Sequence, residues 1–347
     1  MSVILGMAAN RCRVRALDID LGTLPTGERN ALIDVPGVSV GHVTLDTGGP
    51  DNSPCLRTGV TAIHPASRDV FADPVTGAVH VLNGYGKSVG LPQVRELGTI
   101  ETPITLTNTL NVWRVADATV TYVLDRHSDA TSVNAVTGEC NDGLLNDIRG
   151  RHVTADHVRQ ALDEATTDST AEGCVGAGRG TTGFGWKAGI GTASRRVDKH
   201  TVGVLVLTNT GKPADLRIDG LPVGQHVRPD EVTEPPGGSI MIIVGTDAAV
   251  SSRQLDRIAK RAPMGLARTG GIAHHGSGDF VVAFANDRGG AVDDVNLTPL
   301  FRAAIEATEE AIYNSLTKAQ TTTGAGGTTV PALPLEPIRE LALARDG

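Results

Sequence analysis

Two prolines and two glycines lead directly into a serine that begins a run of mostly β-branched residues. The stretch reads Glu234-Pro235-Pro236-Gly237-Gly238-Ser239, and the following residues 240–244 are Ile-Met-Ile-Ile-Val. Proline fixes φ and lacks an amide hydrogen, whereas glycine tolerates strained or positive φ values. We expect a buried strand to begin at Ser239.

The same junction could undergo a chemical reaction. Gly238 carries no Cβ, so the Ser239 hydroxyl can approach the carbonyl carbon that precedes it. Attack there would form an ester, and hydrolysis of that ester would free the α-amine of Ser239. Because an α-amine has a pKa of about 8, a useful fraction would be neutral and could act as a base for its own hydroxyl. The alternative is an ordinary Pro-Gly turn that feeds a strand.

Apolar runs and capping residues elsewhere predict a mixture of strands and helices. Strands are expected at residues 31–35, 38–45, 58–64, 78–82, 201–207, 239–244 and 278–285. Helices are expected at 113–124, after the N-cap Thr154, at 252–267, and after Thr298-Pro299, with a flexible loop at 321–329 and a closing segment at 335–344. Since the elements do not follow a strict βαβ alternation, we expect an α/β sandwich with sheets between helical layers.

Composition excludes several partners. The net charge of −8 and the 3% aromatic content argue against nucleic acid. The four cysteines, at 12, 55, 140 and 174, form no Cys-x-x-Cys pair, which argues against a zinc site and favours a reducing compartment. The first ten residues lack the basic start of a signal peptide, and no apolar stretch is long enough to span a bilayer. We therefore expect a cytoplasmic protein without membrane association.

Asn209 is a candidate for stabilising an oxyanion. It ends the predicted buried strand 201–207 in the sequence Thr208-Asn209-Thr210-Gly211, and its side-chain amide could donate to developing negative charge. The alternative is an ordinary turn residue before glycine.

Ser277 and Asp279 fall on the same side of an incipient strand, where they could share a hydrogen-bond network. Asp279 could then hold a cation such as an ammonium group, although a plain polar loop is the alternative. The preceding His274 and His275 would point to opposite faces of a strand, so we expect no metal site there.

Residues 178–183 formally match a dinucleotide-binding fingerprint. The following residues 184–191 are too rich in glycine to form the helix that such a site requires, so we expect no nucleotide and no other cofactor. Lys187 lies in this stretch. It is either a buried polarising cation or a surface lysine, and spacing alone favours the surface.

Taken together, these segments resemble the self-processing L-aminopeptidase D-amidase/D-esterases, a family that includes the β-peptidyl aminopeptidases and, more distantly, the nylon-oligomer hydrolases. The similarity spans nearly the whole chain. It is carried by residues 30–42, Leu82-Asn83-Gly84, Thr107-Asn108-Thr109, residues 142–147 and 187–195, the Gly238-Ser239 junction, Gly276-Ser277-Gly278-Asp279 and residues 330–335.

The resemblance implies a single four-layer αββα sandwich over residues 1–347. It implies cleavage between Gly238 and Ser239 into subunits 1–238 and 239–347, which stay together and assemble as oligomers, commonly tetramers. Ser239 matches the nucleophile and Asn209 the oxyanion donor. The pair assisting the nucleophile falls on Ser277 and Asp279, and Lys187 matches a lysine of the same stretch in the family.

One segment departs from the family pattern. Close relatives carry an aromatic hydroxyl donor immediately before Asp142-Gly143, whereas this chain reads Glu139-Cys140-Asn141. Asn141 could donate from its amide, or Tyr85 could supply a hydroxyl from elsewhere, so the second oxyanion donor stays open. Glu139 matches an acid that could bind the free ammonium group of a substrate.

The resulting expectation is a serine N-terminal-nucleophile aminopeptidase or amidase. It would release N-terminal amino acids from short peptides, amides or esters, without a metal or a cofactor. One alternative is a hydrolase of non-peptide amides or ω-amino-acid oligomers. Another is an uncleaved, inactive relative that serves as a binding or scaffold protein.

Overall fold

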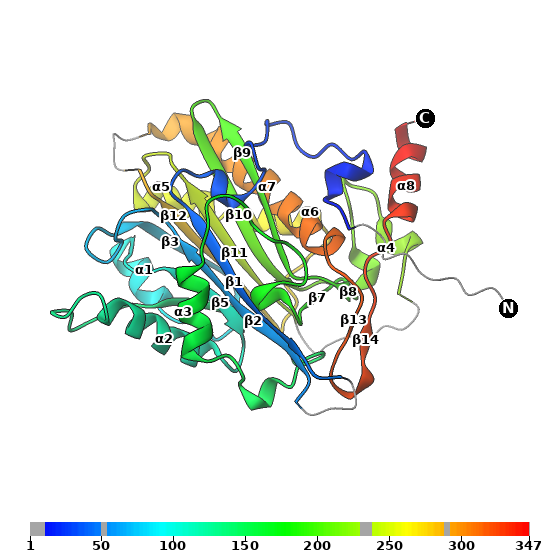
Figure 1. The fold of residues 1–347 in the computed structure, drawn as a ribbon. Helices are drawn as coiled ribbons and strands as arrows, with labels where there is room; N and C mark the ends of the chain where they lie inside the picture. The colour runs from blue at the N-terminus through cyan, green and yellow to red at the C-terminus, as the bar shows by residue number, and fades with distance from the viewer. Residues whose placement is uncertain (1–10, 50–53, 230–237, 288–291, 347) are drawn as a thin grey trace.

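Two β-sheets face each other between two layers of helices in the computed structural model (Figure 1). The structure describes residues 11–49, 54–229, 238–287 and 292–346. The first ten residues, in which we expected no signal peptide, lie outside the described residues, as does the stretch Glu234-Pro235-Pro236-Gly237. None of the helices in the described ranges is long and apolar enough to cross a membrane.

The larger sheet has six strands in the order β4-β3-β12-β11-β10-β9. The central strands β11 and β12 are parallel to each other, and all other neighbouring pairs in this sheet are antiparallel. In sheet order the strands are Thr99–Ile100, Val75–Gly84, Ser277–Ala285, Gly238–Thr246, His200–Asn209 and Ile190–Val197.

The smaller sheet has four strands in the order β1-β2-β5-β6, of which only β5 and β6 are parallel to each other. Its strands are Ser39–Thr47, Leu56–His64, Ile104–Asn108 and Val136–Cys140. Two short hairpins lie outside both sheets: β7 (Thr182–Gly183) with β8 (Trp186–Lys187), and β13 (Thr322–Thr323) with β14 (Thr329–Val330).

Helices cover the outer face of each sheet. On the smaller sheet lie α2 (Val112–Leu124) and α3 (Ala155–Asp163). On the larger sheet lie α5 (Ser252–Ala259) and α7 (Leu297–Thr317), with α6 (Ala262–Arg268) packed on α7. The remaining helices are α1 (Leu91–Leu97), α4 (Val223–His226) and α8 (Glu336–Asp346). The expected α/β sandwich is confirmed.

Strict alternation of side chains assigns the two faces of the larger sheet. Even-numbered residues of β10 and β11 pack toward the helices, among them Val204, Val206, Ile240 and Ile242. Odd-numbered residues pack between the two sheets, among them Leu205, Leu207, Met241 and Ile243. Asn209 and Ser239 continue the odd-numbered rows, so their side chains lie on the face that meets the smaller sheet.

Three predicted elements were wrong. The expected strand 31–35 is a 3₁₀ helix, Leu32–Asp34, because the Asp34 carboxylate accepts the amide hydrogens of Arg29 and Ala31 at 2.9 and 3.0 Å and turns the chain. The expected helix 252–267 is two helices, since Pro263 starts α6 afresh. The expected loop 321–329 closes as the β13–β14 hairpin.

Candidate active site

Ser239 and Asn209 are neighbours across the β10–β11 ladder. The Asn209 amide nitrogen lies 3.4 Å from the Ser239 hydroxyl oxygen, and the Thr182 backbone N–H donates to the Asn209 amide oxygen at 3.1 Å. Because a backbone N–H can only donate, the amide oxygen must face Thr182 and the amino group must face Ser239. The structure thus aims a hydrogen-bond donor at the predicted nucleophile.

Two hydroxyl groups flank Gly238, the residue on the acyl side of the expected cleavage site. A Cβ placed on Gly238 would stand 3.2 Å from Ser277 Oγ and 3.3 Å from Thr210 Oγ1. The Thr210 hydroxyl is buried and has no partner among the described residues. Sequence reasoning missed Thr210, although it directly follows Asn209 at the polar end of an apolar strand.

Ser277 and Asp279 form a buried pair. The Ser277 hydroxyl donates to Asp279 Oδ1 at 2.6 Å, and burial raises the pKa of Asp279 to about 6, partly offset by this hydrogen bond. Asp279 Oδ2 is buried without a partner in the described ranges. Among the described hydrogen bonds none joins the pair to Ser239 Oγ. The pair therefore lies beside the Gly238 backbone, with one carboxylate oxygen able to accept a further donor.

Asn83 holds the loop that carries Ser277 in place. Its side-chain amide donates to the carbonyl oxygens of His274, His275 and Ser277 at 2.9, 3.1 and 2.7 Å. The two histidines lie in this loop before β12, not on the two faces of a strand as assumed. Local sequence could not reveal the role of Asn83, because its partners are more than 190 positions away in the chain.

Glu139 and Asn141 approach the site from the end of β6. The Glu139 carboxylate accepts the Lys87 backbone N–H at 2.9 Å and the hydroxyl of Thr109, and the residue is only 4% exposed. Asn141 is exposed, and its amide oxygen accepts the Gly143 N–H at 2.9 Å. That bond leaves the amino group of Asn141 to face the cavity described next.

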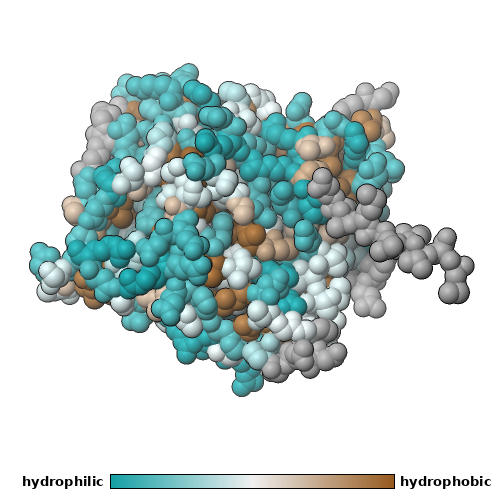
Figure 2. Space-filling model, in the orientation of Figure 1, coloured by the Kyte–Doolittle hydropathy of each residue, from teal (hydrophilic) through white to brown (hydrophobic). Residues whose placement is uncertain are grey.

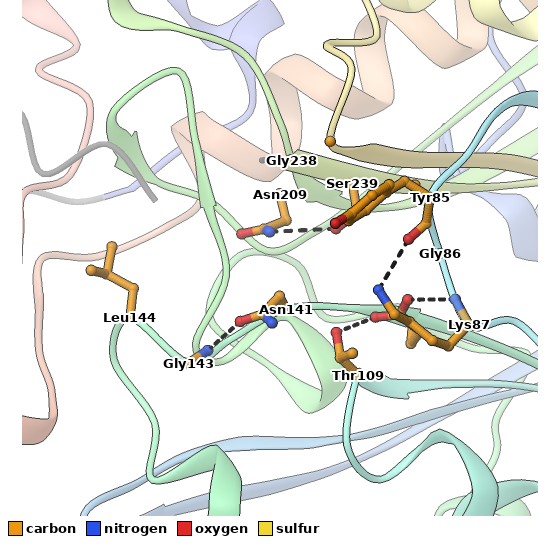
Figure 3. A pocket seen from close by; sticks show the side chains of 13 residues that line it. Tyr85, Gly86, Lys87, Thr109, Asn141, Gly143, Leu144, Asn209, Gly238 and Ser239 are labelled. Atoms are coloured by element: carbon orange, nitrogen blue, oxygen red, sulfur yellow. Dashed lines mark hydrogen bonds between the residues drawn. The ribbon is translucent and has the colours of Figure 1, made fainter. Parts of the chain in front are cut away.

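A cavity of about 470 Å³ joins these groups (Figure 3). Five predicted site residues line it together with Gly238: Tyr85, Glu139, Asn141, Asn209 and Ser239. Its other walls are Gly86, Lys87, Thr109, Gly143, Leu144, Gly276 and Gly278. Tyr85 is 60% exposed and forms part of the mouth.

Lys187 lies outside this lining. It is fully buried, so the interpretation as a surface lysine is wrong. Its ammonium donates to the carbonyl oxygens of Gly178 and Thr181 at 3.1 and 2.8 Å and to that of Ala188, and burial lowers its pKa to about 8. Thr181 precedes Thr182, whose N–H orients Asn209, so Lys187 braces the backbone behind Asn209.

Cys140 is a further residue that sequence reasoning did not assign. Its thiol is buried between the sheets, 3.4 Å from the Leu207 carbonyl oxygen, and it hydrogen-bonds with the Ser239 side chain. Burial raises the pKa of this thiol well above its usual value, so the group is a neutral contact behind Ser239. Nothing in the sequence Glu139-Cys140-Asn141 signals that contact, which arises only because β6 approaches β11.

Similar proteins share both the sequence and the fold. The chain is 37% identical to the β-peptidyl aminopeptidase BapA of Sphingosinicella microcystinivorans, over 98% of this chain and 96% of that protein. The PH0078 protein of Pyrococcus horikoshii OT3 is 44% identical with a TM-score of 0.90, covering 96% and 99% of the two chains.

A third relative is the L-aminopeptidase D-Ala-esterase/amidase of Ochrobactrum anthropi, described as a prototype of the serine aminopeptidases and a variant of the Ntn hydrolase fold. It is 33% identical with a TM-score of 0.88, covering 96% of this chain and 99% of that one. The sandwich described above is therefore of the Ntn hydrolase type. Because the family model of peptidase family S58 also matches residues 30–330, the chain belongs to peptidase family S58.

Proposed function

We propose that this member of peptidase family S58 is a self-processing aminopeptidase or amidase whose nucleophile is Ser239. The observation that carries the proposal is the oriented Asn209 amide, 3.4 Å from the Ser239 hydroxyl, at the first peptide bond of β11. Membership in the family makes the chain a hydrolase of peptide or amide bonds. The cavity beside Ser239 provides room for one small acyl group and its leaving amine.

Processing would proceed by an acyl shift. Ser239 Oγ attacks the Gly238 carbonyl carbon, the Asn209 amide donates to the developing oxyanion, and the peptide nitrogen leaves with the hydroxyl proton. Water then hydrolyses the ester, giving a carboxylate at Gly238 and restoring the Ser239 hydroxyl. The products are subunits 1–238 and 239–347.

Turnover would reuse the same atoms. The new α-amine of Ser239 takes the proton from its own hydroxyl, and Oγ attacks the substrate carbonyl to form an acyl-enzyme. The proton passes to the leaving amine, and water hydrolyses the ester. Asp279, which accepts the hydroxyl of Ser277 beside the Gly238 position and has a second, unpartnered carboxylate oxygen, would stabilise the ammonium form of the amine between cycles.

The decisive experiment follows the fate of the purified chain. Wild-type protein should yield two fragments that co-migrate under native conditions, the smaller beginning Ser-Ile-Met-Ile-Ile. Ser239→Ala should remain one folded, inactive chain. Ser67→Ala, at an exposed serine lining a different cavity, should process normally. An intact wild-type chain that still hydrolyses aminoacyl amides would refute the mechanism, and an intact chain without activity would favour a scaffold role.

Recognition of the substrate amine distinguishes an aminopeptidase from a hydrolase of non-peptide amides. If Glu139 binds the substrate ammonium, N-acetylation of an aminoacyl p-nitroanilide should abolish its cleavage, and Glu139→Gln should raise KM with little change in kcat. Equal turnover of acetylated and free substrates would instead favour a general amidase of the nylon-oligomer type.

We also propose that processed pairs assemble into tetramers in the cytoplasm. Support comes from the apolar residues exposed along β3, where Val81 and Leu82 are 41% and 42% exposed, and from cysteines that all remain free in the structure. Sedimentation analysis of the processed protein should give the mass of four pairs. A mass of one pair would contradict the assembly.

A further inference from the structure

The cavity beside Ser239 carries one positive and one negative side chain. Among the described residues that line it, Lys87 and Glu139 alone are charged. The proposed function uses Glu139 for the substrate ammonium and leaves Lys87 without a role. Since a cation beside an ammonium site would repel a simple amine, the presence of Lys87 calls for a substrate with a compensating negative charge.

Both charged residues line the cavity, and each is held by hydrogen bonds. The Lys87 backbone N–H donates to Glu139 Oε1 at 2.9 Å, which fixes the two residues next to each other. The Lys87 ammonium donates to the Tyr85 carbonyl oxygen at 3.0 Å and lies 5.0 Å from the centre of the Tyr85 ring. No ion pair of Lys87 with a carboxylate, Glu139 included, occurs among the described residues. Figure 3 shows Lys87 and Tyr85 together on one wall of the cavity.

Chemistry limits which substrates present an ammonium and a carboxylate side by side. In an ordinary α-aminoacyl amide, the carbon that bears the ammonium also bears the scissile carbonyl, so no free carboxylate remains there. When the scissile carbonyl belongs to the side chain of an α-amino acid, both charged groups stay on one carbon. The simplest such substrate is a β-aspartyl amide, which is also a β-amino acyl group with a carboxylate on its amine-bearing carbon.

We propose that this site prefers β-aspartyl peptides and amides, in which Glu139 binds the ammonium group and Lys87 binds the adjacent carboxylate. The inference rests on the proposed function, since the side-chain carbonyl must reach Ser239. A charge-assisted hydrogen bond from Lys87 would favour such substrates, whereas the same cation would weaken the binding of carboxylate-free amines. The two effects have opposite signs, which a loss of structural support would not produce.

The test compares two p-nitroanilides on the processed enzyme: β-aspartyl, and β-homoalanyl, in which a methyl group replaces the carboxylate. Wild type should prefer the β-aspartyl compound by about tenfold in kcat/KM, the size of one charged hydrogen bond. Lys87→Met should lose about tenfold on it and gain roughly two- to threefold on β-homoalanyl. High salt should narrow the wild-type preference. Lys199→Met, an exposed lysine lining a different cavity, should change neither value.

Other outcomes overturn the inference. Equal losses on both compounds in Lys87→Met would make Lys87 a support for the cavity wall. A change confined to β-alanyl-leucine, compared with its leucinamide, would assign Lys87 to the carboxylate of the leaving group. Turnover of α-aminoacyl p-nitroanilides without the β-aspartyl preference would defeat the inference and leave the proposed function standing. Processed enzyme that hydrolyses no aminoacyl compound would defeat both.

Discussion

At the scale of single residues, the Asn209 amide is oriented by Thr182, a residue that does not line the cavity. The Thr182 N–H occupies its oxygen, so its amino group has one remaining direction, toward Ser239 Oγ. An amide that is already oriented needs no reorganisation when charge develops on the substrate oxygen, and such preorganisation is the usual source of strong oxyanion stabilisation.

Asn209→Ala should therefore lower kcat by about 10²–10³ with the fold intact, and should slow self-cleavage as well. Steady-state kinetics on the residual processed enzyme and a thermal melt check this. Asn286→Ala is a matched control, because it removes an amide that also makes two hydrogen bonds, to the carbonyl oxygens of Pro36 and Pro65. Near-normal kcat in Asn209→Ala would remove the residue from the mechanism.

Asp279 should give the protein a pH dependence. Burial raises the pKa of its carboxyl from 3.8 to about 6, so the unprocessed fold favours the protonated form and loses stability as pH rises between these values. If the carboxylate assists the junction, self-cleavage of freshly refolded precursor should accelerate as pH rises through about 6. Asp279→Asn should process and turn over slowly at every pH and lose this acidic limb. A variant with full activity and an unchanged pH profile would make Asp279 a purely structural residue.

At the scale of elements, the β7–β8 hairpin is the support of the site. Lys187 ends β8, and its buried ammonium ties together three carbonyl oxygens around the turn that leads to Thr182. Without that cation the Ala188 carbonyl oxygen would lose its described donor, and those of Gly178 and Thr181 would keep only hydrogen bonds of 3.4 and 3.3 Å, from the Thr181 hydroxyl and the Ala188 N–H. The hairpin that fixes Asn209 could then relax.

Lys187→Met should lower kcat more than it raises KM, because it displaces a transition-state donor without touching the cavity. The sign of the pH effect follows from its pKa, lowered from 10.5 to about 8 by burial. Wild type should gain stability as pH rises from about 8 to 10.5, by up to about 3 kcal/mol relative to the Met variant. Urea unfolding of both proteins at several pH values measures the difference. If the free energy of unfolding changed with pH in the same way in both proteins, burial of the charged Lys187 side chain would carry no electrostatic cost.

Strands and helices with a clear hydrophobic pattern were predicted from sequence, whereas elements that depend on tertiary contacts were not. The strand of residues 201–207 is rich in Val and Leu, and Thr154 caps α3 as its sequence suggests. By contrast, β6 reads Val-Thr-Gly-Glu-Cys and exists because it pairs with β5 and packs on β11. The same distinction holds in the site. Ser239 and Asn209 stand at strand ends, whereas Cys140 and Asn83 are defined by partners distant in the sequence, and Thr210 by its position beside Gly238.

At the scale of the whole molecule, the expected cut divides the larger sheet in an unusual way. Strands β11 and β12 lie at the centre and would belong to the second subunit, with β3 and β10, which would belong to the first, on either side. Ion pairs cross the same division: fully buried Arg195 contacts Glu306 and Glu310 of α7 at 3.2 and 2.7 Å. Two subunits produced by this cut would therefore be interleaved, not merely in contact.

Arg195→Met should destabilise the protein by roughly 3–5 kcal/mol, since two buried carboxylates lose a partner. In the processed protein the loss should also appear as separation of the subunits at lower urea concentration. Arg253→Met is the matched control, because its pair with Asp294 is exposed and lies within one subunit, so it should cost less than about 1 kcal/mol. Equal costs for the two variants would show that Arg195 does not hold the subunits together.

The central position of β11 and β12 has a consequence for when a cell acquires this activity. The Ser239–Asn209 contact and the Gly238–Ser277 register exist only after both flanking strands have joined the sheet. A chain that stalls during synthesis or folds incorrectly would thus never liberate its α-amine. Self-cleavage would then couple activation to folding, because only a completely folded chain could cut itself. No separate protease would be needed to activate the correctly folded copies.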